Sequence, residues 1–259
     1  MKSFSFGKFC LYFHVILVYL FLYMPIAVVI AFSFNQDKIS TSWSGFTLKW
    51  YQELYHNKDL LNAVKNSLVV GICSTIVATI LGTLVAFGLE RYSFPGKKLF
   101  EAVLTLPMII PDIVMAVAML AFYTFINISL GMVSIVIAHI SFNITFVAVV
   151  VRARLVGFNY NLEKAAMDLG ATPLKTFWYV SLPLSIPGII AGALLAFTLS
   201  WDDYMIAAMT HGIGSTTLPI TVFAMIRHGV SPEINAISTL MLFFTLTLAF
   251  ISTRFQKHT

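Results

Sequence analysis

Apolar residues dominate six long stretches of the chain, and shorter polar segments separate them. Each stretch reaches roughly 20 residues, the length that an α-helix needs to cross a hydrocarbon core about 30 Å thick. The stretches are continuous instead of alternating over ten residues, so the pattern favours a helical bundle over a β-barrel. We predict an all-α integral membrane protein, a single domain over residues 1–259, with six transmembrane spans at about 9–34, 64–89, 99–125, 132–151, 187–209 and 234–253.

The composition agrees with this class and excludes others. The chain is 59% hydrophobic and 10% charged, whereas a soluble domain is about 45–50% apolar and about 25% charged. A water-soluble enzyme and a disordered chain are therefore excluded. The first apolar run is longer than the core of a secretory signal, so we expect a retained first span. Cys10 and Cys73 fall in apolar stretches and indicate neither a disulfide framework nor a metal site.

The distribution of basic residues predicts the orientation in the membrane. If the amino terminus is cytoplasmic, 11 of the 16 lysines and arginines lie on the cytoplasmic side. Cytoplasmic loops of membrane proteins carry such an excess, so both termini are expected to face the cytoplasm. No basic stripe accompanies the net charge of +5, and no nucleic-acid partner is expected. The eleven residues are Lys2, Lys8, Arg91, Lys97, Lys98, Arg152, Arg154, Lys164, Lys175, Arg254 and Lys257.

The cytoplasmic loop 152–184 has a pattern of its own. Asn161 is suited to cap a short helix, and Gly170 is suited to end it at the position after the C-cap. Between them an apolar residue recurs at i, i+3, i+4 and i+7, as expected for one helical face. The residues of this stripe are Leu162, Ala165, Ala166 and Leu169.

A second short amphipathic helix is predicted directly afterwards. Thr172 would cap it, Pro173 would take its first position, and Pro183 would end it. Its apolar stripe consists of Leu174, Phe177 and Trp178. Neither helix is long enough to span the membrane. The periodicity leaves two interpretations open: the helices rest on the membrane or on their own bundle, or they form a docking surface for another protein.

The same loop carries a family resemblance. Permeases of type I ABC importers share the loop pattern E-A-A-x-x-x-G, nine residues, then I-x-L-P. Ala165, Ala166 and Gly170 match it here, Val180 replaces the isoleucine, and Leu182–Pro183 completes it. Lys164 occupies the position of the family's glutamate, and Glu163 lies one residue earlier. The resemblance implies that the ATPase-coupling residues are Glu163, Lys164, Ala165, Ala166, Gly170, Leu182 and Pro183.

Further segments narrow the resemblance. The chain is similar, within that family, to permeases of polyamine (spermidine/putrescine) importers, although permeases for iron, thiosulfate, phosphonates and molybdate look related, and a permease for another solute stays the alternative. The similar segments are Gly45–Tyr51, Asn66–Leu68, Arg91–Lys97, Pro111–Ala116 and Ser231–Ala236.

The resemblance also implies partners. A second permease would complete the pathway in a bacterial inner membrane, an ABC ATPase dimer would dock on the 152–184 loop, and a periplasmic binding protein would deliver substrate. The motif G-x-x-x-x-G-K-[ST] is absent from the sequence, so ATP and magnesium are expected on the ATPase, with no cofactor and no enzymatic activity in this chain. A stand-alone channel has no use for a paired docking loop. A secondary transporter is disfavoured because inverted repeats are not evident.

Three acidic residues lie inside predicted spans, where a charge costs at least about 2.5–3.5 kcal/mol. Asp112, Asp202 and Asp203 are expected at a shared depth in straight helices, although Pro107 and Pro111 predict a kink or break in the third span. They either line a pathway for a cation, with Trp201 and Tyr204 offering aromatic faces, or bond to neighbouring helices. No catalytic pair and no metal site is indicated.

Two other features each have a structural interpretation and a functional one. His139 is expected to be a hydrogen-bonded packing residue, because no second histidine stands at metal-ligand spacing. Gly188 and Gly192 form a small-x-x-x-small pattern, which permits close approach of helices. We expect this contact inside the bundle, with the second permease as the alternative.

Overall fold

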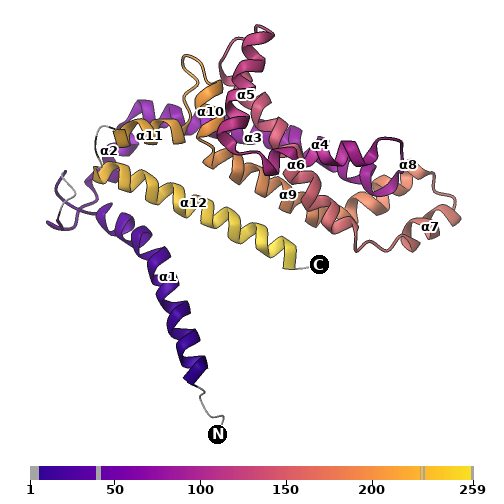
Figure 1. The fold of residues 1–259 in the computed structure, drawn as a ribbon, viewed down its shortest axis with the longest axis horizontal. Coiled ribbons are helices and arrows are strands. Elements are labelled where there is room, and N and C mark those ends of the chain that lie inside the picture. Colours follow the sequence, from indigo (N-terminus) through magenta and orange to yellow (C-terminus); the bar gives the residue numbers. More distant parts are fainter. Residues whose placement is uncertain (1–5, 39–41, 228, 230, 258–259) are drawn as a thin grey trace. The chain divides into compact units, whose positions relative to one another are not determined.

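The protein folds as a helical membrane protein in a computed structural model that describes residues 6–38, 42–227, 229 and 231–257 (Figure 1). An isolated antiparallel bridge joins Asn35 to Phe46, and the described residues contain no strand. The elements are α1 (Phe6–Phe32), α2 (Lys49–His56), α3 (Lys58–Arg91), α4 (Lys97–Ile109), α5 (Asp112–Phe125), α6 (Met132–Leu155), α7 (Asn161–Asp168), α8 (Pro173–Thr176), the π-helical turn η1 (Phe177–Ser181), α9 (Leu182–Asp202), α10 (Met205–Thr210), α11 (Leu218–Arg227) and α12 (Pro232–Lys257).

The predicted spans are present. Five helical stretches are long and apolar enough to cross a membrane, and the bent pair α4–α5 makes a sixth. Lys2 and the side chains of Arg254 and Lys257, which contribute to the predicted orientation, lie outside the described residues. The orientation itself stays a prediction.

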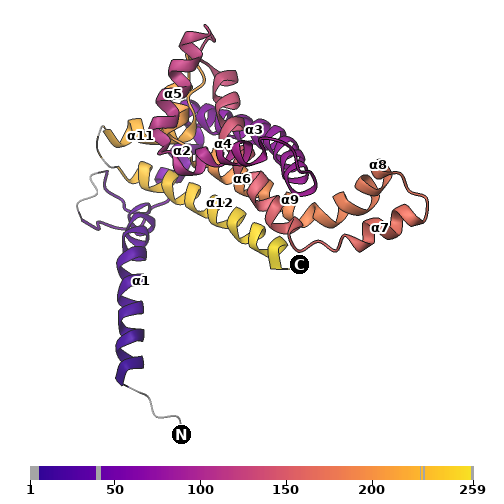
Figure 2. The ribbon, with the colours of Figure 1, turned by 45° about the vertical axis from the view of Figure 1, so that its right-hand side comes forward.

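The third span is broken, as its prolines predicted. The helix axis bends by 111° between α4 and α5 (Figure 2). Ile110, which precedes Pro111, is extended (φ −73°, ψ 132°), because a residue before proline avoids the helical region. Pro107 lies inside α4 without ending it. The straight third span assumed for the depth of Asp112 is therefore not present.

The fifth span begins earlier and ends earlier than predicted. α8, η1 and α9 form one apolar stretch over Pro173–Asp202, and α10 starts separately at Met205. The prediction that Pro183 ends the second loop helix is wrong. Leu182 donates its backbone N–H to the carbonyl of Phe177, five residues back, and this wider π-turn accommodates a proline in the first turn of α9.

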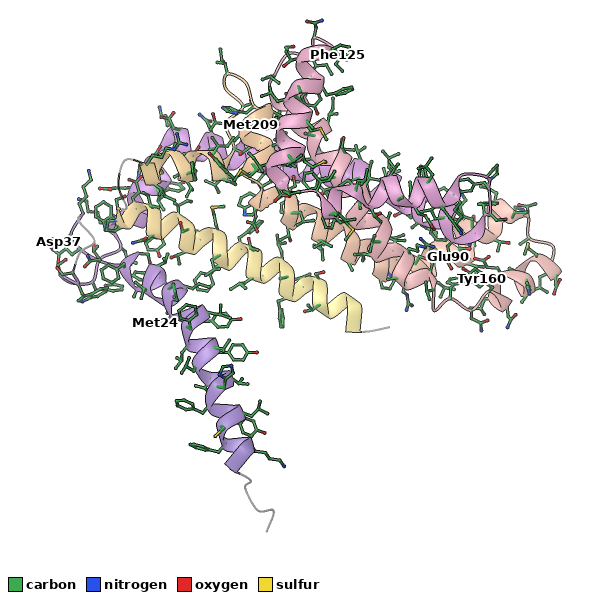
Figure 3. All side chains as sticks on the ribbon, in the orientation of Figure 1. Met24, Asp37, Glu90, Phe125, Tyr160 and Met209 are labelled. Carbon is green, nitrogen blue, oxygen red and sulfur yellow. The ribbon has the colours of Figure 1, made fainter. Side chains whose placement is uncertain are left out.

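The chain forms two units, which are described separately. The first contains Met1–Leu61 and Val222–Phe243. In it, the apolar side chains of α1 are exposed around the helix (Figure 3). Asn35 organises the segment after α1: its side chain bonds Ser42 and Ser44, and its carbonyl accepts from the indole of buried Trp50. The indole of Trp50 is therefore internal to this unit.

The second unit contains Asn62–Thr221 and Phe244–Thr259, and α6 packs closely with α9 in it. Ala86, Phe87, Val147, Val151, Leu155 and Ala196 form a buried apolar cluster. A Cβ on Gly188 would lie 2.8 Å from the Cβ of Arg154, and one on Gly192 3.4 Å from Val147. The small-residue pattern therefore packs inside this chain, as expected.

A methyl group at Gly82 is expected to destabilise this unit. Its Cβ would lie 2.7 Å from the Cβ of Val147 and 2.9 Å from the backbone oxygen of Ile144. Overpacking of this kind costs about 1–3 kcal/mol. Gly82→Ala should therefore lower the thermal unfolding midpoint of the purified protein. Gly88→Ala, on the same helix with open space at its Cβ, is the matched control, and equal midpoints for the two variants would contradict the close packing.

Candidate functional site

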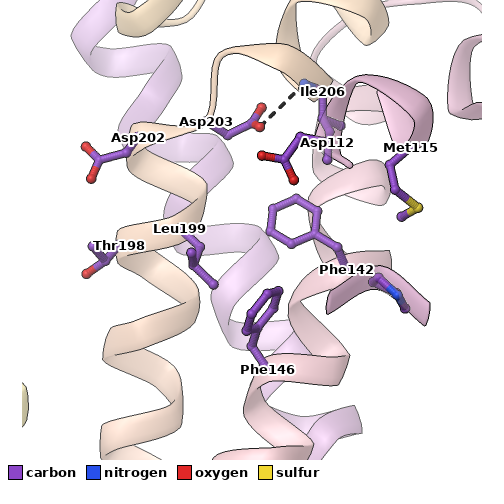
Figure 4. Close-up of a pocket in the computed structure, with 10 residues that line it drawn as sticks. Asp112, Met115, Phe142, Phe146, Thr198, Leu199, Asp202, Asp203 and Ile206 are labelled. Carbon is purple, nitrogen blue, oxygen red and sulfur yellow. Dashed lines mark hydrogen bonds between the residues drawn. The ribbon is translucent and has the colours of Figure 1, made fainter. Parts of the chain in front are cut away.

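A cavity of about 240 Å³ lies in the second unit, where α4, α5, α6, α9 and α10 meet (Figure 4). Its position follows from two helix breaks: the one between α4 and α5, and the one between α9 and α10. Both breaks bring acidic residues to the cavity. The lining consists of Pro107, Asp112, Met115, Phe142, Phe146, Thr198, Leu199, Asp202, Asp203 and Ile206.

Asp112 presents a free carboxylate to this cavity. It is the first residue of α5, where the helix dipole favours a negative charge. Figure 4 shows its carboxylate between Asp203 and the ring of Phe142. Among the described residues, no hydrogen bond and no ion pair involves its side chain. A cation in the cavity could therefore pair with it.

Asp203 is held by its own chain. Its two oxygens accept from the backbone N–H groups of Ile206 (3.4 Å) and Ala207 (2.8 Å), at the start of α10. The Oδ2 atom also lies 3.3 Å from Nε2 of His139. Asp203 thus fixes α10 at the edge of the cavity.

His139 continues this polar contact into the helix bundle. It is buried, and its Nδ1 atom lies 2.6 Å from Oγ of Ser200, which in turn lies 3.1 Å from Oγ of Ser74. The prediction of a hydrogen-bonded packing histidine is confirmed. No sequence signal indicated its partners Ser74 and Ser200, because single serines in apolar spans are common.

The other three predicted pathway residues lie differently. The carboxylate of Asp202 points away from Asp112 (Figure 4) and accepts from Oγ1 of Thr245 at 3.2 Å. Trp201 is 5% exposed, with Phe197 and Phe244 against its ring, and it does not line the cavity. Tyr204 precedes α10 and is also outside the lining. The structure therefore brings Asp112 and Asp203 together and leaves the two aromatic residues apart.

The first loop helix ends as predicted. Gly170 has φ +88°, in the left-handed region. Its N–H bonds the carbonyl of Met167 (2.9 Å), and the N–H of Ala171 bonds that of Ala166 (3.0 Å). This pair of bonds is the Schellman motif, which favours glycine at this position.

The starts of the two loop helices are near the predicted residues. Asn161 is the first residue of α7 instead of its cap, and its N–H bonds the side chain of Asn159 at 3.1 Å. The predicted cap is therefore wrong, because Asn159 supplies the accepting side chain. Thr172 does accept from the N–H of Lys175 at 3.4 Å, with Pro173 in the first position of α8.

The apolar stripes of the loop are covered by this chain only in part: Ala166 and Phe177 are half-buried, and the ring of Phe177 packs against Phe87. Leu169 is 89% exposed, and Leu162, Leu174 and Trp178 are exposed as well. Ala165 and Lys164 are also exposed. Packing on its own bundle therefore describes Phe177, and it does not describe the exposed leucines and Trp178.

Glu163, unlike these exposed side chains, contacts its own chain. Its carboxylate forms an ion pair with Arg91 at the end of α3 and accepts from Oγ of Ser181 at 2.5 Å.

Other charged groups surround this ion pair. Burial and the nearby carboxylates of Glu90 and Glu163 raise the pKa of the Tyr160 hydroxyl, despite the opposing Arg91. Glu90 and Glu101 both contact Arg152 (3.2 and 2.9 Å). In the sequence, Arg91 and Arg152 contributed to the predicted topology, and no pattern predicted these ion pairs.

Known permeases resemble this chain over most of its length. The chain is 38% identical over 244 residues to the spermidine/putrescine transport system permease protein PotC of Haemophilus influenzae, covering 93% of this chain and 95% of that one. It is 42% identical over 234 residues to the putrescine transport system permease protein PotI of Escherichia coli K12, covering 88% and 83%.

Solved structures share the fold. The crystal structure of a bacterial ABC transporter involved in the import of the acidic polysaccharide alginate matches with a TM-score of 0.72 at 17% identity, covering 98% of this chain and 99% of that one. An inward-facing structure of the MetNI methionine ABC transporter matches with a TM-score of 0.61 at 19% identity, covering 83% and 100%.

The family model for the binding-protein-dependent transport system inner membrane component matches residues 78–259, which is most of the chain. The relatives and the solved structures agree with it, and the resemblance to ABC importer permeases is confirmed. The chain belongs to the family of binding-protein-dependent transport system inner membrane components.

Proposed function

We propose that this chain is the permease subunit of an ATP-driven importer that moves polyamines from the periplasm to the cytoplasm. The observation that carries the proposal is the unpaired carboxylate of Asp112 in a cavity between broken spans. The similarity to polyamine permeases at 38% and 42% identity supports the choice of solute.

The chemistry of the cavity suits a protonated amine. A polyamine carries ammonium groups along an apolar chain, and the carboxylate of Asp112, which is exposed to the cavity and has no partner among the described residues, can pair with such a group. Phe142 and Phe146 lie beside Asp112 in the lining, and aromatic faces attract cations. Asp203 adds a second negative group at the edge.

The exposed loop supports a partner on the cytoplasmic side. We propose that an ABC ATPase dimer, which binds ATP and magnesium, docks on the apolar stripe of α7 and on Leu174 and Trp178. A second permease would complete the pathway, and a periplasmic binding protein would deliver the solute. The chain itself would catalyse no reaction; two conformations with different contacts to the ATPase would give alternating access.

This arrangement requires both termini to face the cytoplasm, as the excess of basic residues favours. A green fluorescent protein fused after the last residue should fluoresce in cells, because this reporter folds poorly when exported through the general secretion route. A dark, membrane-inserted fusion would contradict the orientation.

The proposal is tested with the complex reconstituted in liposomes together with its ATPase, second permease and binding protein. We expect ATP-dependent uptake of labelled spermidine or putrescine, and no uptake of thiosulfate, molybdate or iron. ATP-dependent uptake of one of these other solutes instead would support an importer function and contradict polyamine as the solute. Uptake by the purified chain without ATP would reject the importer.

A further inference from the structure

Glu163 occupies a different face of α7 from the proposed docking stripe. Its side chain is 12% exposed in a helix that has no fully buried residue. Leu162, one residue earlier, lies roughly 100° around the helix and is exposed, as is Leu169. One side of α7 therefore contacts this chain, and the other side is free.

The contacts of Glu163 join three segments that are far apart in the sequence. Its Oε1 atom accepts from Nη2 of Arg91, the last residue of α3, and from Oγ of Ser181, the last residue of η1. The guanidinium of Arg91 also lies 4.9 Å from the ring centre of Phe87, and Ser181 is fully buried. We call Arg91, Glu163 and Ser181 the Glu163 cluster. Hydrogen bonds between charged, partly buried groups are stronger than neutral ones.

The Glu163 cluster is connected to the cavity by a single helix. Ser181 directly precedes α9, which continues for 21 residues to Asp202. The next residue, Asp203, accepts from two backbone N–H groups at the start of α10 at the cavity. α9 packs along α6 for much of this length. Pro187 lies inside α9 and removes one of its backbone hydrogen bonds, but α6 supports the helix, so a displacement of Ser181 along the helix axis would be passed on to the acidic residues of the cavity.

The π-turn lies at the junction. η1 covers Phe177–Ser181, between the loop helix and α9. In a π-turn the backbone hydrogen bonds span five residues instead of four. Single π-turns inside helices occur frequently at functional sites. Through Ser181, Glu163 holds the end of this turn.

We propose that Glu163 is a positioning residue: with Arg91 and Ser181 it fixes α7 to α3 and to the start of α9, so that movement of the docked ATPase reaches the cavity. It does not itself bind the ATPase. This inference rests on the proposed function. The alternative is that Glu163 turns outward and contacts the ATPase directly, in place of the glutamate that the loop pattern has at Lys164.

Charge exchange separates the two possibilities. The variants are Glu163→Arg, Arg91→Glu, the double exchange, and Glu163→Gln. Asp168→Asn, which neutralises an exposed acid on the same helix, is the matched control. Each reconstituted complex is assayed for bound ATPase, for ATP hydrolysis with and without the loaded binding protein, and for solute uptake.

The single exchanges Glu163→Arg and Arg91→Glu should leave the ATPase bound and active. Each should lower two values about tenfold: the rate of uptake and the stimulation of ATP hydrolysis by the binding protein. A tenfold change corresponds to the loss of about one charge-assisted hydrogen bond. Glu163→Gln should have a smaller effect in the same direction. The double exchange should restore both values to within about threefold, since the ion pair re-forms with reversed charges. Asp168→Asn should behave as the unchanged protein.

Loss of ATPase binding in Glu163→Arg that the double exchange does not repair would overturn the proposal in favour of direct contact. Single exchanges with normal stimulation would overturn it as well. The stimulation of hydrolysis does not depend on which solute the complex carries, provided that the binding protein is loaded with it. If the complex without substitutions fails to take up polyamine, that result would therefore contradict the proposed substrate and would not contradict the role of Glu163.

Discussion

Replacing Asp112 by asparagine is expected to lower polyamine uptake by about tenfold. Asp112 is exposed to the cavity, so the loss is at the lower end of the roughly 1.5–3 kcal/mol that a hydrogen bond to a charged group contributes, and each 1.4 kcal/mol corresponds to a factor of about ten. The amide has nearly the same shape as the carboxylate, so the cavity of about 240 Å³ would remain. Initial rates of spermidine uptake into proteoliposomes, measured over a range of loaded binding protein, give the effect.

The fold should survive this change. At the start of α5 the charge of Asp112 contributes about 0.3–1 kcal/mol through the helix dipole, and no other described residue depends on its carboxylate. The variant complex should therefore assemble and hydrolyse ATP. Asp112→Glu, which keeps the charge, should recover part of the uptake.

Asp202→Asn is the comparison that tests the geometry. Its carboxylate accepts from Thr245 and points away from Asp112, so its neutralisation should reduce uptake less than that of Asp112. Equal losses in the two variants would mean that charge anywhere near the cavity suffices. A normal uptake rate in Asp112→Asn would show that this carboxylate does not contribute to the pathway.

The sequence was sufficient for features that depend on local chemistry. Six apolar stretches were long enough to give the spans, and Pro111 indicated where the third would break. Gly170 marked the end of α7, because the left-handed conformation at that position favours one residue type. Thr172 and Pro173 marked the start of α8. In each case the signal and its structural effect lie within a few residues of one another.

Features that depend on distant residues were not predictable. Glu163 was grouped with the ATPase-coupling residues because it lies one residue before the pattern's glutamate position, whereas its partners in the structure, Arg91 and Ser181, lie 72 and 18 residues away. Trp201 was grouped with Asp202 because they are neighbours in sequence. On a helix, neighbours point about 100° apart, and Trp201 packs between phenylalanines instead. Pro183 was expected to end a helix, and the π-turn before it could not be inferred from composition.

Replacing Gly170 by valine is expected to reduce uptake about tenfold or more while the protein still inserts in the membrane. No atom lies within 4 Å of a Cβ at this position, so the effect is conformational and not steric crowding. A residue other than glycine at φ +88° is strained by roughly 1–3 kcal/mol, and branching at Cβ adds to this. The Schellman bonds from Gly170 and Ala171 would then weaken, and α7 would lose its fixed direction relative to α8.

Two further substitutions make this result interpretable. Gly170→Asn should be milder, because asparagine tolerates the left-handed region better than other residues with a side chain. Gly157→Val lies in the same loop, also with open space at its Cβ but without a left-handed φ, and should change uptake little. The measurements are uptake, the amount of ATPase that copurifies in mild detergent, and the amount of permease in the membrane. If Gly170→Val and Gly157→Val had equal uptake and equal ATPase binding, the direction of α7 would not matter for docking, and the exposed stripe would need another explanation.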